Sequence, residues 1–87
     1  MNTELGLKVI QEVAMEHGYH LIDDEYSLEI FKCALHPKYF KIKKKDEDLL
    51  VYEREDTKND YGTNTLYTLR NINDVVKYCN EIKSGRN

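Results

Sequence analysis

Cys33 and His36 are the closest thiol and imidazole in the chain, and they form the candidate nucleophilic pair. A histidine activates a cysteine only when the two side chains are within hydrogen-bonding reach. Residues three apart point to opposite faces of a strand but share one face of a helix. Because residues 28–35 favour a strand, we predict a buried, unreactive Cys33 and a protein that is not an enzyme. The alternative stays open, since the apolar spacing of this segment also suits a helix.

Metal ligands are concentrated between His17 and Asp24. His17, His20, Asp23 and Asp24 supply nitrogen and oxygen donors in a short stretch. His17, however, falls in the apolar arc of a predicted helix, where a histidine is usually a core residue. The spacings Cys-x-x-Cys and His-Glu-x-x-His do not occur. We therefore expect no metal. The four glycines are isolated from one another, so no phosphate-binding turn and no cofactor are expected.

A basic segment, Lys38–Lys45, carries five lysines in eight residues and is followed at once by the acidic Asp46–Asp48. Charged residues on a hairpin protect it from edge-to-edge aggregation, which is one interpretation of this segment. A second interpretation is a nucleic-acid contact, because basic groups interleaved with aromatic rings are typical of such surfaces.

The register of this hairpin predicts a binding surface. If a two-residue turn joins the strands, the apolar residues Phe40 and Ile42 face the same side as Leu49 and Val51. The opposite face then carries Tyr39, Lys41, Lys43, Leu50, Tyr52 and Arg54. Tyrosine and arginine are enriched where proteins bind partners. These six residues, together with Tyr61, are therefore the candidate partner-binding residues.

The elements that must position these residues follow from periodicity. Apolar residues recur at helical spacing over 3–17 and 72–83, with Asn2 or Thr3 and Asn71 as N-caps and Gly18 as a stop. Helix 72–83 is predicted to bury Val76 among its apolar positions. Alternation and β-forming residues predict strands at 28–35, 39–45, 49–54 and 65–70, with a short one at 20–23.

The predicted fold is α+β: a small antiparallel β-meander of three to four strands flanked by an N-terminal and a C-terminal helix. We expect one domain, residues 1–87, with both helices on one face of the sheet. Between two of the strands lies a polar loop, residues 55–64, which includes Tyr61 and is longer than most hairpin connections. A loop of this kind is either filler or functional.

Composition limits the function classes. Charged residues make up 33% of the chain and hydrophobic residues 40%, as in globular proteins, and the net charge is −3. This charge gives no overall attraction to DNA or RNA. No apolar run is long enough to span a bilayer, and the N-terminal region is too acidic for a signal peptide. We expect a cytoplasmic protein with reduced cysteines and no membrane partner.

The predicted function is non-enzymatic binding of another macromolecule, most plausibly a protein; a homodimer contact is also compatible. Small acidic domains rich in tyrosine and asparagine are often phage or mobile-element inhibitors that block a host protein, anti-CRISPR proteins among them. The alternative is a small nucleic-acid-binding accessory protein that uses Lys38–Lys45. The order helix–three strands–helix resembles that of double-stranded-RNA-binding domains, which would imply RNA binding. That family carries a lysine cluster at the start of its last helix. Residues 71–77 lack this cluster, so membership is not inferred.

Overall fold

The computed structural model describes residues 1–23, 27–32, 38–54 and 65–84, without the side chains of Lys32, Lys38 and Arg54. These residues form two helices and five strands in the order α-β-β-β-β-β-α. The helices are α1 (Thr3–Glu16) and α2 (Ile72–Ser84). The strands are β1 (His20–Asp23), β2 (Ser27–Lys32), β3 (Lys38–Lys45), β4 (Asp48–Arg54) and β5 (Tyr67–Leu69).

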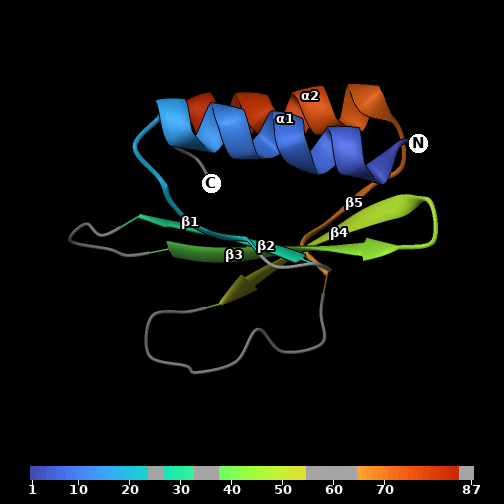
Figure 1. The fold of residues 1–87 in the computed structure, drawn as a ribbon, viewed down its shortest axis with the longest axis horizontal. Coiled ribbons are helices and arrows are strands. Elements are labelled where there is room, and N and C mark those ends of the chain that lie inside the picture. The colour runs from blue at the N-terminus through green and yellow to red at the C-terminus, as the bar shows by residue number, and fades with distance from the viewer. Residues whose placement is uncertain (24–26, 33–37, 55–64, 85–87) are drawn as a thin grey trace.

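The five described strands form one antiparallel sheet in which the spatial order, β1-β2-β3-β4-β5, is the order along the chain. Both helices lie side by side over the same face of this sheet (Figure 1). The predicted α+β class and the antiparallel meander are thus confirmed. The short segment 20–23 is a full member of the sheet, which therefore has more strands than the three to four expected.

The β3–β4 hairpin has the predicted register. Lys45 is paired with Asp48, so the connection is the two-residue turn Asp46–Glu47. Asp46 has a φ of 55°, in the left-handed region that aspartate tolerates better than most residues. Ile42 is paired with Val51, and both are fully buried. The tight turn therefore directs the apolar residues of both strands toward the helices.

The ambiguous segment 28–35 is a strand where it is described. Strand β2 spans Ser27–Lys32 and pairs with β1 on one side and β3 on the other. Residues 33–37, which include Cys33 and His36, lie outside the described residues. The last predicted strand, 65–70, is shorter than expected, because only Tyr67–Leu69 joins the sheet.

The core lies between the sheet and the two helices. Its largest fully buried side chain is Phe40 in β3. The other buried apolar residues are Ile10, Ala14, Tyr19, Leu28, Ile30, Ile42, Leu49, Val51, Leu69, Val75, Tyr78, Cys79 and Ile82. Every described strand from β2 to β5 contributes to this cluster, and Leu21 of β1 packs against it. The helix-covered face of the sheet is therefore the buried one.

Helix α1 packs closely against β4 and α2 at Gly6. A Cβ atom at Gly6 would lie 3.0 Å from Leu49 Cδ1 and 3.5 Å from Val75 Cγ2. The absence of a side chain at Gly6 thus allows α1 to approach both the sheet and α2. The ends of the helix are as predicted: Asn2 Oδ1 accepts a hydrogen bond from the Leu5 N–H at 3.1 Å, and Gly18, with φ 82°, follows the last turn.

The N-terminus of α2 is capped from both directions. Asn71 Oδ1 accepts a hydrogen bond from the Asp74 N–H, and Asp74 Oδ2 accepts one from the Arg70 N–H, each at 2.9 Å. The Asp74 carboxylate also lies in the first turn, where the helix dipole favours a negative charge. These contacts fix the point at which the chain leaves β5 and enters α2.

Replacing Asn71 by alanine is expected to lower the free energy of unfolding by about 1 kcal/mol, because the Asp74 N–H loses its acceptor. Asn73→Ala is the matched control in the same turn, where the side chain is exposed. Alanine favours a helix interior over asparagine, so Asn73→Ala should be neutral or slightly stabilising. Urea denaturation of both variants is the measurement; equal effects would show that Asn71 does not act as a cap.

The buried stripe of α2 differs from the predicted one. Val76 was expected in the core, but it is 50% exposed, and Ile72 is 47% exposed. The buried residues are Val75, Tyr78, Cys79 and Ile82. The apolar arc of the sequence is wider than the surface that α1 and the sheet cover, and its Ile72–Val76 flank is left in contact with water.

Candidate functional site

The sheet face opposite the helices, called the open face below, is the candidate site. Strand alternation places side chains there from every strand. Its described residues include His20, Ile22, Glu29, Phe31, Tyr39, Lys41, Lys43, Leu50, Tyr52 and Thr68. They alternate along the strands with the buried core residues and are half-buried or exposed. No described helix covers this face (Figure 1).

Three aromatic rings form a row across the open face. Register pairs His20 with Phe31 and Phe31 with Tyr39. The ring centroids are 5.4 Å apart in the first pair and 5.6 Å in the second, with interplanar angles of 29° and 18°. The rings are thus stacked against one another across β1, β2 and β3. Such pairs contribute roughly 0.5–1.5 kcal/mol beyond burial, so the row is a preorganised element of the surface.

A mixed row runs parallel to the aromatic one. Register aligns Ile22, Glu29, Lys41 and Tyr52 across β1 to β4. Lys41 Nζ lies 3.8 Å from Glu29 Oε1, and both side chains are partly exposed. An ion pair of this kind contributes only about 0–1 kcal/mol. Its main consequence is for charge: a carboxylate is placed next to a lysine of the basic segment.

The third row consists of the buried Ser27 on β2, Lys43 on β3, Leu50 on β4 and Thr68 on β5. Lys43 is exposed, and Leu50 is half-buried beside it. The open face therefore combines rings, aliphatic groups and charges of both signs over the width of the sheet.

The structure brings most of the predicted binding residues together. Tyr39, Lys41, Lys43, Leu50 and Tyr52 all have register positions on the open face. Arg54 is opposite Tyr39 in the β3–β4 register, and its side chain is not described. Tyr61 and the rest of the 55–64 loop lie outside the described residues.

His20, Ile22 and Phe31 belong to the same surface and were missed from the sequence. The signal was present for Phe31: if Leu28 and Ile30 face the core, period two directs Glu29 and Phe31 outward. The apolar spacing of residues 28–35 also suits a helix, in which Glu29 and Phe31 would not share a face. His20 was considered only as a metal ligand.

The candidate catalytic pair, Cys33 and His36, lies outside the described residues, and the candidate metal ligands do not converge within them. Cys79 is a buried free thiol, and burial raises its pKa while Lys83 acts in the opposite direction. A thiol in this state is a poor nucleophile. His17 is not a core residue but the half-buried C-cap of α1. Within the described ranges, no group of three or more histidines, cysteines and carboxylates could hold a metal ion. Asp24 lies outside them.

Neither described helix has the length and apolar character needed to cross a membrane. In comparisons with known proteins, no family model matches this chain, and no curated protein or solved structure is significantly similar to it.

Proposed function

We propose that the protein functions by binding a partner protein through the open face, without catalysing a reaction. The observation that supports this most directly is the stacked row of His20, Phe31 and Tyr39. Aromatic side chains provide large contact areas and lose little conformational entropy on binding, because few bonds rotate. Leu50 and Tyr52 extend this surface onto β4.

The charge distribution favours a protein over a nucleic acid. Alternation divides the basic segment between the two faces: Lys41, Lys43 and Lys45 have positions on the open face, where Lys45 is paired with Asp48, whereas Lys44 is paired with the core residue Leu49. Lys41 has Glu29 beside it. A surface that follows a phosphate backbone needs several cations without interspersed carboxylates. Local charges of both signs instead suit a protein surface with complementary charges.

The ring geometry leads to the same conclusion. Proteins that bind single strands stack bases on the exposed faces of aromatic rings. Here Phe31 lies between His20 and Tyr39, at centroid distances of 5.4 Å and 5.6 Å, so both of its faces meet protein rings. Phe31 therefore offers a partner its ring edge, which suits contacts with aliphatic and aromatic side chains.

Binding through the open face suggests a mechanism of action, steric blocking. A ligand that covers its partner's surface blocks that surface to others and requires neither a cavity nor a reactive group. We therefore extend the proposal to inhibition by steric blocking in the cytoplasm, as phage and mobile-element inhibitors such as anti-CRISPR proteins act. This extension rests on the type of protein and not on a motif.

Replacing Tyr52 by alanine is expected to weaken partner binding by roughly 5–30-fold, the effect of truncating a hot-spot residue. The stability of the Tyr52→Ala variant should be close to that of the parent, because Tyr52 lies outside the core cluster. The matched control is Lys8→Ala, an exposed position on α1 over the other face of the sheet. The measurement is affinity capture from a lysate of the source organism, followed by titration of the captured partner.

Capture by the parent and by Lys8→Ala, but not by Tyr52→Ala, would support the proposal. Lys41→Ala then tests the partner's class. For a protein partner it should change mainly the association rate, whereas for a nucleic acid it should weaken binding to all sequences and reduce the salt dependence. A partner that binds Tyr52→Ala and the parent equally would contradict the proposal. A concentration-dependent dimer abolished by Tyr52→Ala would show that the partner is a second copy of the chain.

A further inference from the structure

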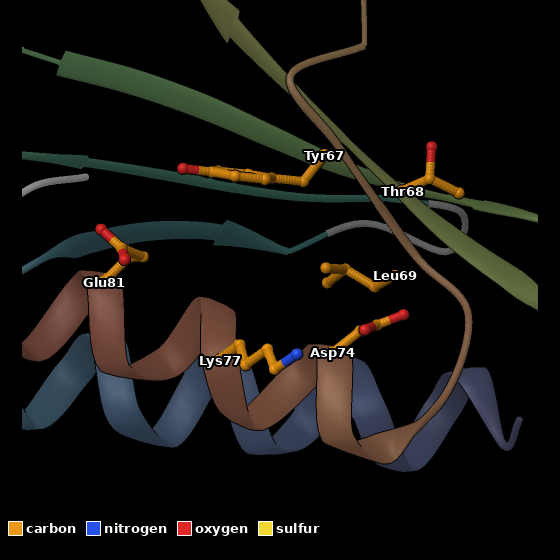
Figure 2. A pocket seen from close by; sticks show the side chains of 6 residues that line it. All are labelled: Tyr67, Thr68, Leu69, Asp74, Lys77 and Glu81. Atoms are coloured by element: carbon orange, nitrogen blue, oxygen red, sulfur yellow. The ribbon is translucent and has the colours of Figure 1, made fainter.

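Strand β5 and helix α2 enclose a groove on the helix side of the sheet, away from the open face. Its cavity has a volume of about 280 Å³ and is lined by Tyr67, Thr68, Leu69, Asp74, Lys77 and Glu81. Figure 2 shows Tyr67 extending over the groove from β5, with Lys77 and Asp74 across from it on α2. Pockets for small molecules are typically about 300–1,000 Å³. The volume is thus better suited to one or two side chains of a larger ligand.

The groove runs beside a sheet edge. Among the described strands, β5 is the last in the sheet and has β4 as its only neighbour. Residues 66 and 67 both lie opposite Val51: Tyr67 is its register partner, and the Leu66 N–H donates to the Val51 carbonyl at 2.7 Å. The chain is therefore already bonded to β4 one residue before β5 begins. An edge strand presents backbone donors and acceptors on its outer side, where another extended chain can pair.

The wall of the groove is apolar and held in place. Tyr67 is 41% exposed, and its ring lies 5.5 Å from that of the buried Tyr78, tilted by 56°. Leu69 is buried at the base. Leu66, just before β5, is 44% exposed. An apolar side chain entering the groove would therefore contact Tyr67 and Leu69 and remove exposed apolar surface from water.

Charge distinguishes the groove from the open face. Among the residues that the structure describes, its lining has two carboxylates, Asp74 and Glu81, and one ammonium group, Lys77. Asp74 already accepts the Arg70 N–H in the helix cap. Glu81 lies two turns further along α2, near the end of the groove that the Tyr67 ring approaches in Figure 2. The excess of negative charge is complementary to a basic side chain.

We propose that this groove binds an extended peptide segment of a partner protein, which pairs with β5 as an added strand. One apolar side chain of the peptide enters between Tyr67 and Leu69, and a lysine or arginine two residues away approaches Glu81. Alternate side chains of a strand point to the same side, so both can enter the groove while the backbone pairs with β5. This site does not depend on the function proposed for the open face.

The test uses an array of random dodecapeptides probed with the full chain. Selected sequences should have a lysine or arginine two residues from an apolar residue. With the best peptide in solution, Tyr67→Ala and Glu81→Lys should each weaken binding by about tenfold or more, as truncation or charge reversal at a contact does. Lys77→Ala should strengthen binding several-fold, since it removes a positive charge that repels the basic side chain of the peptide. Lys8→Ala is the control, because Lys8 is exposed on α1 and does not line the groove.

Backbone pairing is tested on the peptide itself. N-methylation removes a backbone donor. In a paired strand, alternate N–H groups point toward the neighbouring strand and the others point away from it. Methylating the nitrogens that point toward β5 should therefore abolish binding, whereas methylating the alternate nitrogens should be tolerated. Equal tolerance of both sets of methylations would overturn strand addition. Failure to select any peptide with a Kd below about 1 mM would overturn the site. A peptide whose binding is lost in Tyr52→Ala and kept in Tyr67→Ala would also overturn it, and would assign the peptide to the open face.

Discussion

Replacing Val75 by aspartate is expected to unfold the protein, because the carboxylate would be placed at a fully buried position in the first turn of α2. Val75 has 0% exposure and packs where α2 meets Gly6 of α1. An unpaired charge in such a site costs several kcal/mol, and the total stability of a small domain is only about 5–15 kcal/mol. Circular dichroism during thermal melting should show either a large fall in the melting temperature or no cooperative transition.

Val76→Asp is the matched control one residue further along the same helix. Because Val76 is 50% exposed, its aspartate remains hydrated, and we expect a change within about 0.5–1 kcal/mol. A parent-like melting temperature for Val75→Asp would mean that the helix does not pack as described. Equal destabilisation by both substitutions would show that Val76 is covered in solution, for instance by a second copy of the chain.

Replacing Phe40 by alanine is expected to destabilise the protein by about 3–5 kcal/mol, the cost of deleting a large core side chain and leaving a cavity. Phe40 is 1% exposed and lies on β3, at the middle of the sheet. Because Phe40 faces the helices, it cannot contact a partner on the open face. Any loss of partner binding in this variant should therefore result from unfolding. Denaturant unfolding gives the stability change, and the captured partner provides the binding measurement.

Tyr39→Ala is the neighbouring substitution with the opposite expectation. Tyr39 faces the open side and stacks on Phe31, so its removal should cost only about 1 kcal/mol of stability. Binding should nevertheless weaken roughly 5–30-fold in a folded variant. If Phe40→Ala proves as mild as Tyr39→Ala, the assignment of faces along β3 is wrong. If Tyr39→Ala binds like the parent, the aromatic row is structural and not part of the interface.

The β3–β4 hairpin shows how much local sequence determines. Phe40 and Ile42 alternate with tyrosine and lysine, and a two-residue turn permits only one relative phase of the strands. The buried and outward faces of 39–54 could therefore be predicted residue by residue. The caps of both helices could also be predicted from the sequence, since Asn2, Gly18 and Asn71 act through neighbours at most four residues away. These features depend on interactions that are short in sequence.

Features that depend on contacts between distant segments were determined by the tertiary structure alone. The arc of apolar residues on α2 includes both Val75 and Val76, and packing against α1 and the sheet determined which one is buried. The row of His20, Phe31 and Tyr39 exists because β1, β2 and β3 pair in one particular register. The β5–α2 groove depends likewise on how the chain turns between Leu69 and Ile72. A helix or strand pattern specifies an amphipathic surface, but the width and partner of that surface are set by the elements that pack against it.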